Sequence, residues 1–410
     1  MRHIIFSAIS AIFALACVSA AMGDGDSGIQ FLEDRVRRDP DDLIAWNQLA
    51  ERYHCELRRT GDDRYIAREM QAAEKSLQAI PAEQNPDGLA ALAQAHLTAH
   101  RFKEARAAAL QLSKMPQAKI RSLELLVDAA MELGDYGEAR EACEELAKLE
   151  GAELSAAPRL AKLAYIEGNL EQSREHWQMG LAHSVNRAAT EPETVAWFHL
   201  QLGALAFKGG DWDSAEKHYA DAGKAWPEGY AVEDYVAELR GAQGRTAEAI
   251  ALYEKLAARV PRPEFFQALG DLQMLAGEPK TAAEWHARAE AAFLKSVREG
   301  GVHFYHHLAG FYADSKEDAK QAVEWARKDL TLRSSINAHD ALAWALYKNG
   351  EAAEASTEFA KALATGTRDP HLLYHAAMIR MASGDIAGGK RAMQEAAEVN
   401  PKFNTFHVHR

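Results

Sequence analysis

The chain has 410 residues, 48% of them apolar, and 47 Lys and Arg against 60 Asp and Glu give it a net charge of −13. The apolar content is enough for a buried core, and only 12 prolines in Ala-rich sequence favour an all-α fold. An acidic chain without a basic stripe argues against a nucleic-acid partner.

Residues 1–21 have the pattern of a cleaved secretory signal. Arg2 supplies the positive charge, residues 4–18 form a short apolar run, and Ala20 is a small residue suited to cleavage. The run is short for a membrane span. We therefore predict an exported protein, periplasmic or extracellular, with no transmembrane segment in the mature chain. Lipid attachment through Cys17 is the alternative.

Gly and Asp dominate residues 22–30, which predicts a flexible leader. A first helix is expected over 31–38, and Asp39-Pro40 ends it. Two cysteines follow, Cys55 and Cys143, in different predicted helix pairs. The sequence leaves open whether they are free or paired, although the position of Cys143 favours a small buried side chain.

A repeat of 34 residues organises the rest of the chain. Gly134 and Gly168 are 34 residues apart, and a small residue follows five positions after each of them, at Ala139 and Ser173. Glycine allows the left-handed backbone with which one helix turns into the next. The series continues at positions 210, 244, 277, 316, 350 and 384, with longer intervals that predict insertions around 184–192 and 295–302.

This pattern resembles the tetratricopeptide repeat, whose units of 34 residues each form two helices. Residues 193–227 match it most closely, whereas the eighth unit has Lys316 where Gly is usual. We expect an all-α fold, a right-handed α-α superhelical solenoid of about ten such helix pairs over 31–403, with a tail at 404–410. The units are placed near 41–81, 86–116, 119–151, 154–184, 193–227, 230–261, 263–294, 302–334, 336–366 and 369–401.

Two segments add a narrower resemblance. The order Phe31, Asp39-Pro40, Trp46, and the stretch from Ala341-Leu342-Ala343-Trp344 to Tyr374-His375, look like a bacterial family of exported repeat proteins. That resemblance implies no enzymatic activity. We therefore expect no catalytic residues and no cofactor.

In proteins of this architecture, the first helices of the units line a concave groove. Side chains two and five positions on either side of the anchoring Leu are expected to face it. Aromatic groups there suit a peptide partner, and carboxylates favour a basic segment; the alternative is that these side chains pack between helices. The candidate binding residues are Trp197, Phe207, Asp234, Glu238, Asp271, His303, His306, Asp340, Trp344, Tyr347 and Tyr374.

Two functions follow from these observations. The first is a non-enzymatic exported scaffold that binds a protein or peptide partner in its groove. The second is a metal-binding protein that uses C-terminal histidines, because His303 lies one helical turn before His306 and His307. His371 and His375 form a further pair of this kind, although such pairs are more often ordinary histidines.

Overall fold

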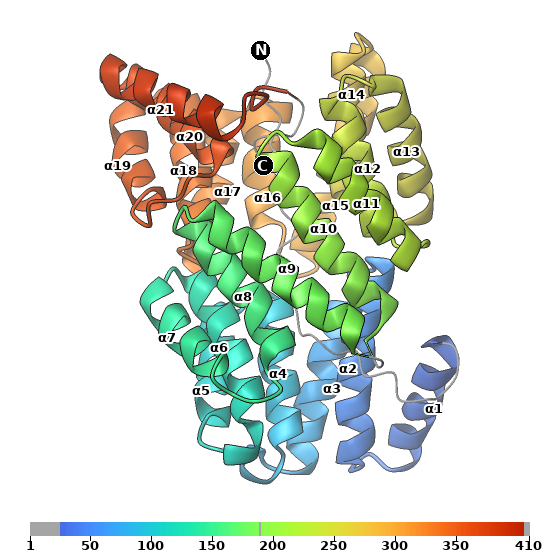
Figure 1. Cartoon of the computed structure of the whole chain (residues 1–410). Helices are drawn as coiled ribbons and strands as arrows, with labels where there is room; N and C mark the ends of the chain where they lie inside the picture. The colour runs from blue at the N-terminus through green and yellow to red at the C-terminus, as the bar shows by residue number, and fades with distance from the viewer. Residues whose placement is uncertain (1–24, 188–189, 406–410) are drawn as a thin grey trace. The chain divides into compact units, whose positions relative to one another are not determined.

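The computed structural model describes residues 25–187 and 190–405. The predicted signal segment 1–21, Cys17 and residues 406–410 lie outside this part. The described residues form helices joined by short turns, with no strand among them, so the prediction of an all-α repeat fold is confirmed (Figure 1). No helix in the described part of the chain combines the length and the apolar character that crossing a membrane requires.

The α-helices of this part are α1 (Gly25–Arg38), α2 (Leu43–Thr60), α3 (Arg64–Ala79), α4 (Pro86–Thr98), α5 (Phe102–Leu112), α6 (Lys119–Leu133), α7 (Tyr136–Leu146), α8 (Glu153–Ile166), α9 (Leu170–Asn186), α10 (Pro192–Lys208), α11 (Trp212–Ala225), α12 (Tyr230–Ala242), α13 (Thr246–Arg259), α14 (Pro263–Leu275), α15 (Pro279–Arg298), α16 (Tyr305–Gly310), α17 (Ala319–Leu332), α18 (Ile336–Lys348), α19 (Ala352–Ala362), α20 (Pro370–Ala382) and α21 (Ile386–Val399). Short 3₁₀ turns span Ala82–Gln84 and Pro116–Ala118, and a π-helical turn spans Phe311–Ser315.

Helix α1 begins at Gly25, so the prediction of a flexible leader was wrong for residues 25–30. Three side chains at helical spacing, Ile29, Leu32 and Val36, are buried and pack in one core cluster with residues of α2 and α3. Because an amphipathic stripe gains stability only when it is covered, this packing orders a stretch whose composition resembles that of a loop.

The turns between helices follow the predicted glycine positions. Gly134 caps α6 in the left-handed conformation, with φ of 76°. In the irregular eighth unit, α16 has only six residues and continues into the π-helical turn. The left-handed residue there is Glu317, with φ of 53°. A side chain disfavours that conformation, so the missing glycine coincides with a distorted first helix.

The small residues that follow the turn glycines lie in the interior. Ala139 and Ser173, five positions after their turn glycines, have no exposed surface. Cys143 is likewise fully buried, and it is a free thiol, so it does not pair with Cys55. Burial raises the pKa of Cys143 to about 12, which makes this thiol a packing residue and a poor nucleophile at neutral pH.

The described residues divide into two compact units. The N-terminal unit comprises residues 25–160, together with 187 and 190–191. The C-terminal unit comprises residues 161–186 and 192–405. The boundary falls inside α8, and each unit has its own core.

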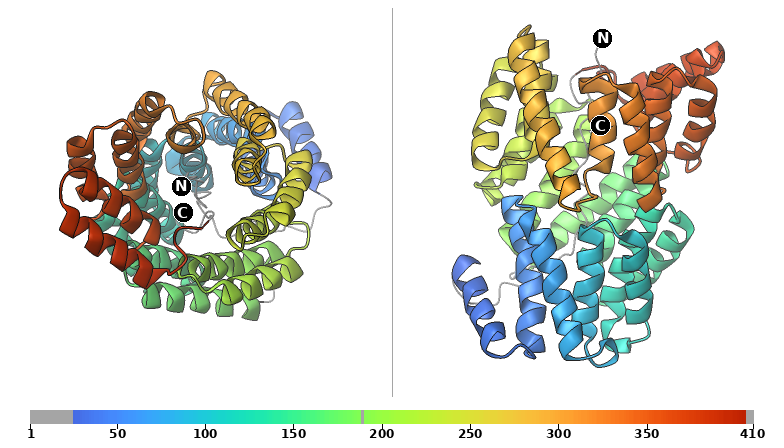
Figure 2. Two further views of the ribbon diagram at one scale, coloured as in Figure 1. Left: turned by 90° about the horizontal axis from the view of Figure 1, so that it is seen from above. Right: turned by 180° about the vertical axis from the view of Figure 1, so that it is seen from behind.

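Within the C-terminal unit, the first and last helix pairs meet (Figure 2). Thr365 Oγ1 donates a hydrogen bond to the carbonyl of Ile166 over 2.7 Å, and the Tyr165 hydroxyl donates to Asp369 over 2.6 Å. Lys402 donates to the Gly210 carbonyl over 3.1 Å. These partners are 192 to 204 residues apart in the chain, so the helix pairs of this unit curve round until its ends touch.

Candidate functional site

The eleven predicted groove residues lie mostly inside the protein. None is exposed, and His303, His306 and Tyr347 are half-buried. Eight of the eleven are at most 7% exposed. These eight are Trp197, Phe207, Asp234, Glu238, Asp271, Asp340, Trp344 and Tyr374.

The buried carboxylates of this set have partners within the protein. Asp234 accepts a hydrogen bond from the Tyr253 hydroxyl over 2.9 Å, and Asp271 lies 2.7 Å from Nε2 of His286. Burial raises the pKa of Asp271 in spite of the nearby imidazole. Both carboxylates therefore help to join the two helices of one pair, α12 to α13 and α14 to α15.

The aromatic residues near the C-terminus form one stacked group. Trp344 lies flat against the ring of His375, with ring centroids 3.8 Å apart and planes at 6°, and Tyr347 and Tyr374 pack beside it. The Trp344 indole donates to Asp314 over 3.1 Å, and burial raises the pKa of Asp314 to about 6. Replacing Trp344 would therefore disturb the packing of the core as well as the binding of any partner.

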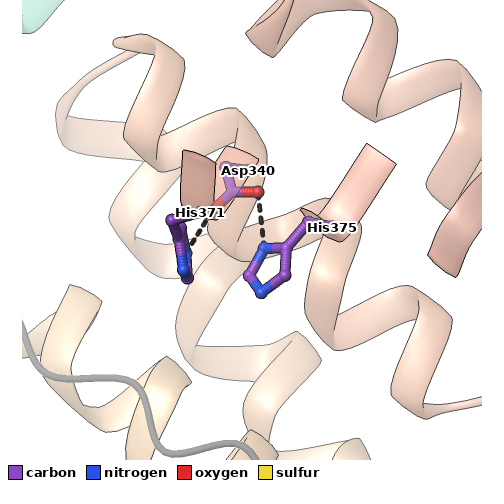
Figure 3. Close-up of side chains that lie close together, drawn as sticks. All are labelled: Asp340, His371 and His375. Atoms are coloured by element: carbon purple, nitrogen blue, oxygen red, sulfur yellow. Dashed lines mark hydrogen bonds and ion pairs between the residues drawn. The ribbon is translucent and has the colours of Figure 1, made fainter. Parts of the chain in front are cut away.

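The structure does not gather His303, His306 and His307 into one three-ligand group. His306 Nδ1 lies 3.4 Å from Asp329, whereas His307 Nε2 lies 3.5 Å from Glu264. Within the described part of the chain, the group of three side chains that could hold a metal is Asp340, His371 and His375 instead (Figure 3).

An open pocket of about 830 Å³ lies within the N-terminal unit. The first helices of three successive pairs, α2, α4 and α6, supply most of its wall, with α3 behind them. Five carboxylates but only two cationic side chains line it, so the pocket is acidic. The polar lining residues are Asn47, Gln48, Glu51, His54, Glu69, Asp87, Gln94, Gln117, Lys119, Arg121, Glu124 and Glu150, and Ile44 is an exposed apolar one.

The deepest part of this pocket is a polar network. His54 Nδ1 lies 3.2 Å from Glu69, and Arg121 bridges Gln94 at 2.9 Å and Glu124 at 2.8 Å. Burial alone would raise the pKa of Glu124, but the nearby guanidinium groups outweigh burial and place that pKa below its ordinary value. The bottom of the pocket therefore holds a pre-arranged charge pattern.

Three buried polar atoms in this network have no hydrogen-bond partner among the described residues. They are Nε2 of His54, Oε2 of Glu69 and Nε2 of Gln94, on side chains that are 7%, 1% and 4% exposed. A buried polar atom without a partner costs about 1–3 kcal/mol. Each of the three residues lines the pocket, so its wall holds polar groups whose hydrogen-bonding capacity is not used by the described residues.

None of the predicted groove residues lines this pocket, but the signal for it was in the sequence. Ile44, Asn47, Glu51 and His54 stand five and two positions before, and two and five after, Leu49. All four line the pocket. The predicted groove residues all lie in the fifth and later units, whereas the same offsets in the first unit give one wall of the pocket.

Successive helix pairs whose first helices line a hollow define a helical-repeat protein. A family model described as tetratricopeptide repeat matches residues 90–153 and 237–297. The chain contains tetratricopeptide repeats.

Solved structures with a similar fold have low sequence identity to this chain. A tetratricopeptide repeat protein from Parabacteroides merdae is 18% identical, with a TM-score of 0.42, and the match covers 60% of this chain and 93% of that one. Yeast Tom70 is 12% identical, with a TM-score of 0.37 and coverage of 92% and 93%. BtubC from P. vanneervenii is 17% identical, with a TM-score of 0.39 and coverage of 51% and 92%. Among curated proteins, no sequence matches this chain.

Proposed function

We propose that this protein is a non-catalytic, exported scaffold that binds a segment of a partner protein in the pocket of the N-terminal unit. The observation that carries the proposal is the set of unpartnered buried polar atoms at the bottom of that pocket. The pattern of residues 1–21 supports export. Tetratricopeptide repeats generally serve as interaction scaffolds, which supports a role without catalysis.

The chemistry of the pocket favours a basic partner segment. Its excess of carboxylates attracts Lys and Arg side chains. The unpartnered oxygen of Glu69 can accept a hydrogen bond from such a group, and the amide nitrogen of Gln94 can donate to a peptide carbonyl. Ile44, 58% exposed at the rim, offers an apolar contact to the same segment.

A direct test uses three labelled peptides of equal length, one rich in Lys, one neutral and one rich in Glu. We expect the basic peptide to bind most tightly by fluorescence anisotropy, with an affinity that falls as salt rises. Glu69→Gln should weaken its binding about tenfold, because one charge-assisted hydrogen bond to the ligand is lost. The substitution keeps the shape of the side chain and an acceptor for His54.

Glu171→Gln is the matched control, because Glu171 is an exposed glutamate of the C-terminal unit paired with Arg174. It should bind the basic peptide as the wild type does. Equal affinity for all three peptides, or equal loss in Glu69→Gln and Glu171→Gln, would show that the pocket is not the site. Circular dichroism of each variant confirms that the helices are intact.

The partner itself can then be sought by affinity capture from an envelope extract. The mature wild-type chain and the double variant Ile44→Ser/Glu69→Gln are compared side by side. A partner of this pocket is retained by the first and lost from the second. A protein retained equally by both binds elsewhere on the chain.

A further inference from the structure

Two helices of the C-terminal unit bring two imidazoles and one carboxylate together (Figure 3). Asp340 lies on α18, and His371 and His375 lie one turn apart on α20. Asp340 Oδ1 is 2.8 Å from Nδ1 of His375, and Oδ2 is 3.2 Å from Nε2 of His371. One potential donor atom from each residue lies within 4.8 Å of the other two.

The three side chains are removed from water. His375 has no exposed surface, and Asp340 and His371 are 5% and 6% exposed. Among the described residues, the ion-pair partners of Asp340 are these two histidines, and no Lys or Arg pairs with it. A buried carboxylate needs a compensating positive charge. A cation between the three side chains supplies that charge without protonating either ring.

The donor set suits a transition metal. Neutral imidazole and carboxylate are ligands that zinc and its neighbours prefer, and three protein ligands leave one position for water or a further ligand. Donors in a tetrahedral zinc site lie about 3.3–3.4 Å apart, given metal–ligand distances of roughly 2.0–2.1 Å. The spacings of 2.8 and 3.2 Å, which run to the two oxygens of Asp340, are a few tenths of an ångström shorter than that, and one donor atom from each residue lies within 4.8 Å of the others.

The surroundings also hold one ligand in place. The Trp344 ring stacks on His375, and its indole nitrogen is anchored by the Asp314 carboxylate at 3.1 Å. Lys348 in turn lies 3.2 Å from Asp314. Such outer contacts fix the orientation of a metal-binding imidazole. Nε2 of His375 has no hydrogen-bond partner among the described residues, so it is available to carry the ring proton when Nδ1 binds a metal.

We propose that Asp340, His371 and His375 form a binding site for one divalent transition-metal ion of the zinc class within the C-terminal unit. The site is independent of the pocket in the N-terminal unit, so a failure of one proposal leaves the other intact.

The test starts from untagged full-length mature protein, stripped with a chelator, equilibrated with Zn²⁺ or Co²⁺ and desalted. Long equilibration is needed because the site is buried. We expect one equivalent of retained metal per chain by elemental analysis, and the visible absorption of four-coordinate Co²⁺. Asp340→Asn should weaken binding at least about 100-fold, since losing an outer contact to a ligand alone costs roughly 10–100-fold.

Two controls separate this site from other histidines. His199 and His218 form a half-buried pair with ring nitrogens 3.2 Å apart, and no carboxylate of the described residues bonds to them, so His199→Gln should retain the metal. His303→Ala/His306→Ala should retain it too. Loss of metal in either control, with retention in Asp340→Asn, would overturn the proposal.

X-ray absorption of the loaded wild type covers the case in which Asp340→Asn does not fold. Two imidazoles and an oxygen donor around the metal are the expected result. Absence of retained metal in the wild type, or a metal surrounded by water alone, would show that the cluster is a hydrogen-bonded group only.

Discussion

Replacing Arg159 with Met is expected to lower the free energy of unfolding of the N-terminal unit by about 3–5 kcal/mol. Arg159 is 2% exposed, and its guanidinium lies 2.6 Å from Asp128 while donating to the backbone carbonyls of Glu124 and Ser155. Methionine fills a similar volume, so the main loss is of charge. Asp128 would remain buried without its cation. Glu124 would lose one of the two guanidinium groups near it and keep only that of Arg121.

Urea unfolding followed by two probes can measure this loss. Circular dichroism reports on helices of both units, whereas seven of the eight tryptophans lie in the C-terminal unit, with Trp46 the exception. The circular dichroism transition should shift while most of the fluorescence transition stays in place. Arg174→Met removes an exposed pair with Glu171 and should change stability by less than about 1 kcal/mol. Equal effects of the two substitutions would contradict the prediction.

The effect of Arg159→Met should also depend on pH. Burial favours the protonated form of Glu124, but Arg121 and Arg159 lower its pKa below the ordinary value. Such a group stabilises the fold above its unfolded pKa, and this stability is lost as the pH falls through the folded pKa. The difference between wild type and variant should therefore persist from pH 7 down to the ordinary Glu pKa of about 4.3 and shrink as the pH falls below it. A difference that grows on acidification would rule out this explanation.

The sequence predicted what depends on local spacing. Turn glycines such as Gly134 were found because a left-handed residue must stand between paired helices. The first part of α1, residues 25–30, was predicted as a loop because its glycines and its aspartate are typical of one. What orders it is the covering of Ile29 and Leu32 by later helices, and local composition carries no trace of that contact.

The candidate sites were likewise predictable only where the signal is local in the sequence. Helical offsets indicate which side of a helix a residue faces, but not whether neighbours fill the space there. The offsets predicted that Trp344 faces the groove, but its side chain is 1% exposed, stacked on His375 and hydrogen-bonded to Asp314. The pair His371 and His375 was visible as one helical turn, whereas its meeting with Asp340 required the packing of α18 against α20. Contacts across 200 residues, such as Tyr165 with Asp369, have no local signal.

The contact between Tyr165 and Asp369 is the basis of the second large expected effect on stability. Asp369 is 4% exposed and performs two tasks with one carboxylate. It caps the start of α20 by accepting from the backbone N–H of His371 and Leu372. It also accepts from the Tyr165 hydroxyl at 2.6 Å and from Lys208 at 2.7 Å, and so joins the two ends of the C-terminal unit.

We expect Asp369→Ala to destabilise the C-terminal unit by about 4 kcal/mol. Loss of the cap accounts for about 1 kcal/mol, and the rest comes from a buried tyrosine hydroxyl and an ammonium group left without their shared acceptor. Tryptophan fluorescence during urea unfolding reports mainly on this unit. Hydrogen exchange should also quicken around Ile166 and Thr365, whose own hydrogen bond lies beside the lost one.

Asp385→Ala measures the loss of a helix cap alone, and so separates the capping role of Asp369 from its contacts with Tyr165 and Lys208. Asp385 caps α21 through the backbone N–H of Gly388, and its exposed carboxylate has no contact with α8 or α10 in the described residues. Its replacement should cost only about 1 kcal/mol and leave exchange at Ile166 unchanged. If both variants lose the same stability, Asp369 acts only as a cap. A larger loss in Asp369→Ala, with a matching loss in Tyr165→Phe that is not additive with it, would show that the ends of this unit hold each other in place.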